Sequence, residues 1–131
     1  MKNNYCYFNG KILPIDKVKI YPDDLGILRG YGIFDVVKTV NDKIFLFDEH
    51  FKRMENSAKS YGLKLPLGKD ELKKIMKNLD RKNKIKNATI RIVLTAGRSV
   101  DAMHFDPSSP TFYILVNELK LLPEDYYEKG G

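Results

Sequence analysis

The residues with the clearest chemical potential stand one helical turn apart, at His50, Arg53 and Ser57. An arginine guanidinium is planar and permanently charged, and it can grip two oxygens of a phosphate with parallel hydrogen bonds. Residues three or four positions apart share one side of a helix, so His50 and Ser57 are placed to brace the arginine. Without further context an arginine on an amphipathic helix is usually solvated or salt-bridged, and His50 is expected as a structural neighbour rather than a catalyst.

The stretch around these residues predicts the elements that position them. Residues 32–40 predict a central strand, because apolar side chains populate both of its faces. A turn at residues 41–43 leads to a second apolar strand over residues 44–47. Asp48 is predicted as the N-cap of the following helix, which carries apolar side chains at helical spacing and stops near Gly62. The predicted unit is strand, hairpin, strand and helix.

This order of elements and its motifs resemble the N-terminal domain of the class IV aminotransferases. These pyridoxal-phosphate enzymes include branched-chain and D-amino-acid aminotransferases and aminodeoxychorismate lyase. The family reads approximately Tyr-Gly-Asp-Gly-Val-Phe-Glu, then an Asn-Gly hairpin, then His-x-x-Arg-Leu-x-x-Ser-Ala. This chain has Arg-Gly-Tyr-Gly-Ile-Phe-Asp over residues 29–35 and His-Phe-Lys-Arg-Met-Glu-Asn-Ser-Ala over residues 50–58. Tyr31 within the glycine pair and Asp35 in place of a Glu are departures that bear on the subfamily, not on the family.

The resemblance implies roles for side chains in three parts of the chain. Arg53 is implied to bind the phosphate of pyridoxal 5'-phosphate, and Phe34 to line the substrate pocket, with ordinary core packing as its alternative. Arg91 stands where branched-chain aminotransferases place an arginine that meets a substrate side-chain acid. Arg98 and His104 lie in the loop from which D-amino-acid aminotransferases draw an arginine and a histidine to hold the α-carboxylate. An exposed loop arginine is otherwise usually solvated.

The resemblance also implies what this chain lacks. In the family, the Schiff-base lysine and the acid that meets the pyridine nitrogen lie in a larger C-terminal domain. Such a lysine needs a pKa depressed by burial or by a nearby cation, and no lysine here matches the catalytic motif. We therefore expect no catalytic residue in this chain, an N-terminal small domain over residues 1–125, and the start of an interdomain linker over residues 126–131. The C-terminal cofactor domain is expected beyond Gly131.

The full enzyme is expected to transfer an amino group between an amino acid, branched-chain or D-, and a 2-oxo acid, both small molecules. The chain alone is expected to be inactive. A lyase acting on aminodeoxychorismate is the nearest alternative. The resemblance further implies a homodimer whose active sites borrow loop residues across the interface.

The remaining patterns complete the predicted fold. They are a hairpin over residues 5–13, a helix over residues 69–83, and strands over residues 87–95 and 112–116. In the strand at 87–95, alternate residues Ile90, Ile92 and Leu94 share one face and Arg91 points to the other. Two helices set against hairpin-connected strands predict an α+β fold with a mostly antiparallel sheet. The polar loop over residues 96–110 is long enough to indicate a functional loop.

Length and composition bound the remaining possibilities. With 131 residues, of which 43% are hydrophobic, the chain holds one domain's worth of core. Its apolar runs are far below the ~20 residues of a membrane span, and no signal-peptide core follows Met1. A soluble cytoplasmic protein without a membrane partner is expected. Cys6 is the only cysteine, which excludes an intrachain disulfide and a cysteine-cluster metal site, and no metal is expected.

The net charge of +6 is concentrated in residues 69–86. This segment also carries Leu72, Ile75, Met76 and Leu79, the apolar stripe of a surface helix. Its charges are read as a solvated helix face, with a basic nucleic-acid-binding module as the distant alternative. Nucleic-acid binding needs basic residues to converge with exposed aromatic side chains, and the aromatic residues here fall mainly in predicted strands. Nucleic acid is therefore not expected as a partner.

Overall fold

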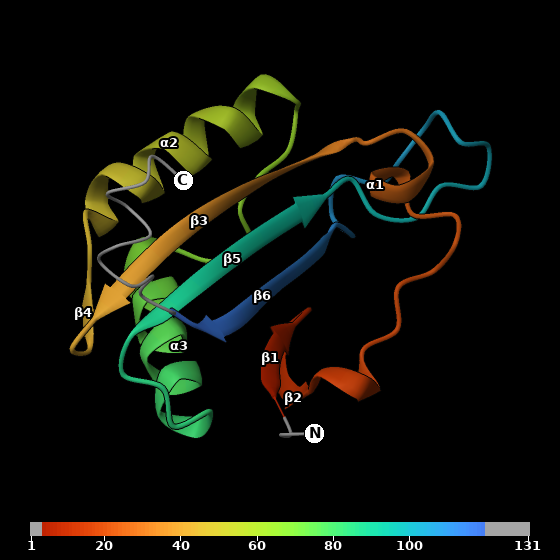
Figure 1. The fold of residues 1–131 in the computed structure, drawn as a ribbon. Helices are drawn as coiled ribbons and strands as arrows, with labels where there is room; N and C mark the ends of the chain where they lie inside the picture. The colour runs from red at the N-terminus through yellow and green to blue at the C-terminus, as the bar shows by residue number, and fades with distance from the viewer. Residues whose placement is uncertain (1–3, 120–131) are drawn as a thin grey trace, which may run out of the picture.

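Alternating burial along three long strands places one face of a sheet against two helices (Figure 1). The computed structural model describes residues 4–119. In chain order the elements are β1 (Tyr5–Phe8), β2 (Lys11–Pro14), a 3-10 turn η1 (Ile15–Lys17), α1 (Leu25–Leu28), β3 (Gly32–Val40), β4 (Lys43–Ile44), α2 (Phe47–Ser60), α3 (Lys69–Lys82), β5 (Ala88–Thr95) and β6 (Thr111–Glu118).

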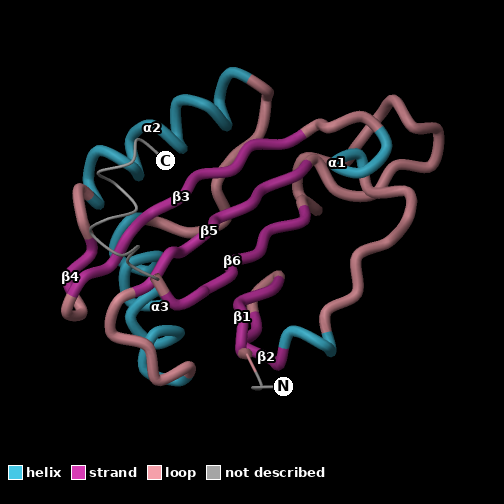
Figure 2. The backbone as a smooth tube through the Cα atoms, in the orientation of Figure 1, coloured by secondary structure: helices cyan, strands magenta, loops and turns pink. Residues whose placement is uncertain are grey.

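The strands form a single antiparallel sheet in the order β2-β1-β6-β5-β3-β4 (Figure 2). β3 pairs with β5 from Gly32 opposite Thr95 to Thr39 opposite Ala88. β4 pairs only with the C-terminal end of β3. The rest of that edge of β3 has no strand partner among residues 4–119. This antiparallel sheet with helices on one face confirms the predicted α+β fold.

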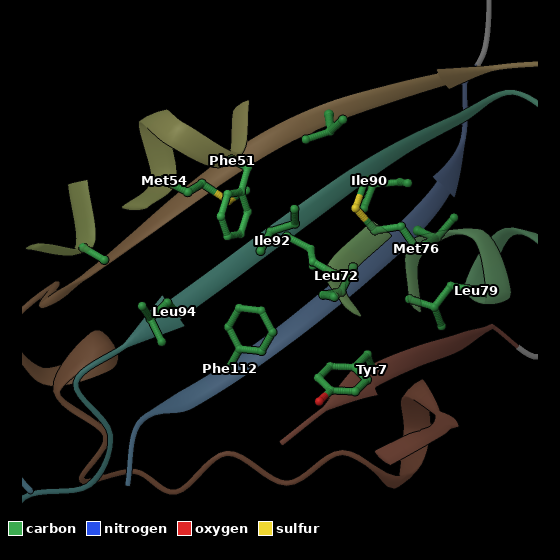
Figure 3. Packing of buried hydrophobic residues seen from close by; sticks show 14 of the residues in the cluster. Tyr7, Phe51, Met54, Leu72, Met76, Leu79, Ile90, Ile92, Leu94 and Phe112 are labelled. Atoms are coloured by element: carbon green, nitrogen blue, oxygen red, sulfur yellow. The ribbon is translucent and has the colours of Figure 1, made fainter. Parts of the chain in front are cut away.

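The core lies between the sheet and the helices α2 and α3 (Figure 3). Ile90, Ile92 and Leu94 all point into it, which confirms the predicted alternation along β5. Burying a large apolar side chain stabilises the fold by roughly 1.5–3 kcal/mol, so this layer fixes the sheet against the helices. The helical side chains that meet it include Phe51 and Met54 of α2 and Leu72, Met76 and Leu79 of α3.

The start of α2 differs from the sequence prediction. The N-cap is Leu46, not Asp48, and it lies in the left-handed region with φ 53°. Turning the chain there carries Phe47 into the core, where it is 5% exposed and packs against Phe51. The predicted strand over residues 44–47 is correspondingly cut to its first residue, because β4 ends at Ile44. Asp48 instead lies in the first turn, where a negative charge favours the helix.

Other predicted boundaries are confirmed. Gly62 ends the turn after α2 with φ 71°, a conformation that favours glycine.

Cys6 is buried as a small apolar side chain. No helix within residues 4–119 has both the length and the apolar character needed to cross a membrane. The predicted linker over residues 126–131 lies outside the described residues.

Candidate functional site

Arg53 is held by an acid on the neighbouring strand. Its Nη2 donates to Asp35 Oδ1 at 2.6 Å and lies 2.9 Å from His50 Nδ1. Asp35 occupies a position of β3 that faces the helices, where it is 8% exposed, and its Oδ1 also accepts the backbone N–H of Val36. The predicted contact between His50 and Arg53 is therefore present. A carboxylate fixed by the strand thus sets the direction of a guanidinium on the helix.

His50 can serve this arrangement in two protonation states. Its Nδ1 lies 3.1 Å from Asp35 Oδ2 as well as beside Arg53. A bare Nδ1 accepts a hydrogen bond from Arg53, whereas a protonated Nδ1 donates to Asp35. In either state Arg53 keeps its bond to Asp35, and we call Asp35, His50 and Arg53 the Asp35 cluster.

The Arg53 side chain remains open to solvent beyond the Asp35 cluster. It is 63% exposed and lies at a shallow hollow on the outer surface of α2. Asp35 engages only one of its nitrogens, so other N–H groups of Arg53 remain available to a ligand. The hollow is lined by Glu49, Lys52, Arg53, Asn56, Ser57 and Ser60. Two cations, two hydroxyls and an amide make a donor set that suits a phosphate.

The opposite face of the sheet carries two more of the predicted residues. Phe34 is 72% exposed, which excludes its alternative as a core residue. Arg91 is exposed and stands opposite Val36 on β3 and Leu115 on β6. No ion pair to Arg91 is present within residues 4–119. An exposed guanidinium on an otherwise apolar stretch of sheet can meet a carboxylate.

Beside Phe34 the open face is hollowed into a pocket of about 250 Å³. It lies where the ends of β3, β5 and β6 meet the segment around α1, and its walls include Phe34, Tyr113, Ile27 and Gly32. Gly32 is required there, because a Cβ at this position would stand 2.7 Å from the Leu94 carbonyl oxygen. The glycine at the start of β3 and the end of β5 thus approach more closely than a side chain allows.

The structure separates the predicted site residues more than it gathers them. Phe34 and Arg91 project from the open face, whereas Arg53 is held on the helix-covered side through Asp35. The two sides meet only around the edge of β3 that lacks a strand partner along most of its described length. Figure 1 shows α2 running alongside this edge. A ligand that touches both Arg53 and Phe34 has to lie at that edge.

The loop residues are each engaged by an acid. Arg98 pairs with Asp23, with Nε 2.8 Å from Oδ1 and Nη2 3.0 Å from Oδ2. His104 Nδ1 lies 2.6 Å from Asp101 Oδ2. Hydrogen bonds from the backbone and side chain of His104 hold the pKa of the Asp101 carboxyl well below its usual range. Neither side chain is merely solvated.

Comparison with known proteins shows the family to which the chain belongs. The sequence model described as amino-transferase class IV matches residues 32–130. The chain belongs to the class IV aminotransferases. The match spans β3, the Asp35 cluster and the loop between β5 and β6, so the predicted site residues lie within the matched segment: Phe34, Arg53, Arg91, Arg98 and His104.

Similar proteins carry several activities within this family. A protein of Methanocaldococcus jannaschii, provisionally named a branched-chain-amino-acid aminotransferase, is 34% identical over 123 residues, which cover 91% of this chain and 42% of that protein. The D-alanine aminotransferase of Staphylococcus epidermidis is 28% identical over 93% of this chain and 43% of its own length. The aminodeoxychorismate lyase of Bacillus subtilis is 30% identical over 87% and 40%. The chain thus spans less than half the length of these relatives.

Solved structures show the same fold. The branched-chain amino acid aminotransferase of Escherichia coli superposes with a TM-score of 0.82 at 23% identity, over 90% of this chain and 42% of that one. A T.th. branched-chain amino acid aminotransferase, solved with pyridoxamine 5'-phosphate, gives 0.79 at 22% identity, over 95% and 43%. The predicted family and the predicted fold are both confirmed.

Sequence reasoning missed a buried acid that organises this class IV chain. Asp24 is 1% exposed and accepts hydrogen bonds from the Gly26 backbone, Thr95 and Thr111. It joins the segment before β3 to the ends of β5 and β6, around the pocket beside Phe34. Its side-chain partners Thr95 and Thr111 stand 71 and 87 residues away along the chain, so they leave no local signal in the sequence.

Proposed function

We propose that this chain is the small domain of a pyridoxal-phosphate enzyme that transfers an amino group between an amino acid and a 2-oxo acid. The observation that carries the proposal is Arg53, which is fixed by Asp35 through one nitrogen and open to a ligand through the others. The relatives named as branched-chain and D-alanine aminotransferases support the same reaction class.

The donors around Arg53 fit the phosphate of pyridoxal 5'-phosphate. We infer that Arg53 makes the main charged contact, and that Ser57 and Asn56 add neutral hydrogen bonds from the same hollow. Asp35 and His50 hold the guanidinium in place, so it loses little rotational freedom when it binds. When bound, the cofactor supplies the electron sink for the reaction. That a solved relative of the fold holds pyridoxamine 5'-phosphate is consistent with this assignment.

The substrate is proposed to lie against the open face of the sheet, next to the free edge of β3. There Phe34 offers an apolar wall and Arg91 a cation for an acidic substrate group. These contacts orient an amino acid or a 2-oxo acid and exclude water from its side chain. The carboxylate role that the resemblance implies for Arg98 and His104 stays a prediction.

The rest of the enzyme is proposed to complete the site. The lysine that bonds the cofactor and the acid for the pyridine nitrogen are expected from sequence outside the described residues. We further propose a cytoplasmic location and, as the resemblance implies, a homodimer. The loop between β5 and β6 is suited to an interface, because Val100 and Met103 expose apolar side chains there.

A second candidate is an aminodeoxychorismate lyase, favoured by the relative with that name in Bacillus subtilis. A nucleic-acid-binding role has less support, since α3 buries its apolar stripe against the core and leaves only its lysine-rich side in solvent. Tight nucleic-acid binding with a steep salt dependence would favour that role.

Turnover by the protein from the complete gene tests the proposal. The purified protein, supplied with pyridoxal 5'-phosphate, is assayed with 2-oxoglutarate and a panel of L- and D-amino acids, and separately with aminodeoxychorismate. Amino transfer supports the proposed function, and turnover of aminodeoxychorismate alone supports the second candidate. The 131-residue chain by itself is the control, and amino transfer by it would contradict the small-domain assignment.

A further inference from the structure

Arg98, at the start of the loop after β5, is occupied by side chains of this same chain. Its Nε and Nη2 bind the two carboxylate oxygens of Asp23 at 2.8 and 3.0 Å. Its guanidinium carbon lies 3.9 Å from the centre of the Tyr21 ring. One edge of the guanidinium is therefore filled by a carboxylate, and one face is covered by an aromatic ring.

The backbone holds the two partners in register. The Ser99 N–H donates to the Asp23 carbonyl at 3.1 Å, and the Leu25 N–H donates to the Gly97 carbonyl at 2.9 Å. An isolated antiparallel bridge also joins Asp24 to Arg98. Because these bonds already order both segments, the side-chain pair forms with little additional loss of entropy.

A dissolved carboxylate competes poorly for such an arginine. To bind the same edge it must displace Asp23, whose carboxylate is tethered beside Arg98 and so acts at a high effective concentration. To bind elsewhere it approaches a guanidinium whose charge is balanced, with the negative charge of Asp23 nearby. Hydrogen bonding within the pair lowers the pKa of Asp23 and raises that of Arg98, as expected for two groups that hold each other in the charged form.

We propose that Asp23 is a specificity-determining residue, which withholds Arg98 from substrate carboxylates and makes Arg98 a brace for the loop. The inference rests on the proposed function for its consequence. With Arg98 withheld, Arg91 remains as a guanidinium for a substrate acid, because it lies on the same open face as Phe34 and has no ion-pair partner in the described part of the chain. The chain then favours substrates recognised on the sheet over D-amino acids held by a loop arginine.

Arg53 and Arg98 differ in how much of the guanidinium is already occupied by other side chains. Asp35 reaches only Nη2 of Arg53, whereas Asp23 takes a complete two-nitrogen edge of Arg98. No ring stacks on Arg53 among residues 4–119, whereas Tyr21 covers Arg98. The same chain thus presents one arginine to a ligand and withdraws another.

The experiment follows the Nε–Hε signal of Arg98 in the 131-residue chain during titration with pyruvate, at constant ionic strength. The readout is the initial slope of its NMR shift against pyruvate concentration in wild type, Asp23→Asn and Asp16→Asn. The matched control removes an exposed acid that lies outside the pair. The slope is expected to be small and equal in wild type and in Asp16→Asn. In Asp23→Asn it is expected to rise up to about fivefold, the effect of breaking an exposed ion pair.

Two results would overturn the proposal. One is a wild-type slope equal to that of Asp23→Asn, because Arg98 would then bind carboxylates despite its partner. The other is a flat response in both, because Asp23 would then not be what withholds Arg98. Asp23→Ser repeats the test if Asp23→Asn does not give a dispersed, folded spectrum. The readout needs neither cofactor nor turnover, so a failure of the proposed enzyme activity leaves its outcome intact.

Discussion

Asp35 on β3 and Arg53 on α2 meet with a separation of 2.6 Å between Oδ1 and Nη2, and this contact joins the central strand to the helix that carries the candidate phosphate site. The same carboxylate receives the Val36 N–H and contacts His50. One nearly buried acid therefore binds the backbone of its own strand and two side chains of the helix that carries the candidate site.

Replacing Asp35 by Ala is expected to lower the free energy of unfolding by about 1–3 kcal/mol, because partly buried donors lose their acceptor. Urea unfolding followed by circular dichroism measures the change. Arg91→Ala is the control on the same sheet, and since Arg91 is exposed it is expected to change stability by less than about 0.5 kcal/mol. Equal effects of the two substitutions would show that the Asp35 cluster does not stabilise the fold.

The buried carboxyl group of Asp80 is expected to make the free energy of unfolding depend on pH. It is 2% exposed, its Oδ1 has no hydrogen-bond partner in the described structure, and burial raises its pKa from 3.8 to about 6. At a pH between these two pKa values, Asp80 is largely protonated in the folded state and largely ionised in the unfolded state. The contribution of Asp80 to stability therefore falls as the pH rises from about 4 to about 6.

Asp80→Asn is expected to remove this contribution, worth about 2–4 kcal/mol between acidic and neutral pH. Urea unfolding of both proteins from pH 4 to pH 8 is the measurement. The difference in stability, variant minus wild type, should increase with pH and level off above about 6. The Thr39 hydroxyl donates to Asp80 Oδ2 and can also donate to an amide oxygen, so the variant keeps that bond. A difference that is independent of pH would contradict the raised pKa.

Asp24→Ala is expected to destabilise the chain by about 2–4 kcal/mol, because Thr95, Thr111 and the Gly26 N–H lose a shared buried acceptor. Thermal unfolding gives the comparison. Asp16→Ala, at an exposed site, is the matched control and should leave the transition nearly unchanged. Similar transitions for the two variants would rule out Asp24 as the link between α1 and the ends of β5 and β6.

Glycines 97 and 10 offer a further paired test. Both have positive φ, at 85° and 99°, so alanine is strained at either position by about 1 kcal/mol. At Gly97 an added Cβ would also collide with the Ser109 carbonyl, whereas at Gly10 it would meet nothing within 4 Å. Gly97→Ala should therefore lower the unfolding midpoint in urea clearly more than Gly10→Ala. Equal midpoints would show that the loop yields at no cost.

The sequence predicted what local patterns determine. The strand Gly32–Val40 has its predicted bounds, and β5 exposes Arg91 while burying Ile90 and Ile92. These features follow from apolar spacing alone. The start of α2 was misplaced, because the turn at Leu46 is set by the need to bury Phe47 and has no glycine or asparagine to announce it.

The sequence indicated candidate site residues but not how these residues are arranged in space. Motif spacing indicated Arg53 and its neighbour His50 on one helix, whereas the role of Asp35 depends on how the helix packs against its strand. The pairing of Asp23 with Arg98 joins positions 75 residues apart, and only the assembled sheet brings them together. Ion pairs between distant segments carry no periodic signal in a sequence.

The affinity for a phosphate-bearing cofactor tests whether Arg53 binds the phosphate. Pyridoxamine 5'-phosphate is titrated into the protein from the complete gene, as wild type, Arg53→Ala and Lys52→Ala, and dissociation constants are measured by calorimetry. We expect a loss of affinity on the order of tenfold to a hundredfold for Arg53→Ala, with a clearly smaller loss for Lys52→Ala, a cation from the same hollow. Unchanged affinity in Arg53→Ala, in a protein that remains folded, would contradict this expectation.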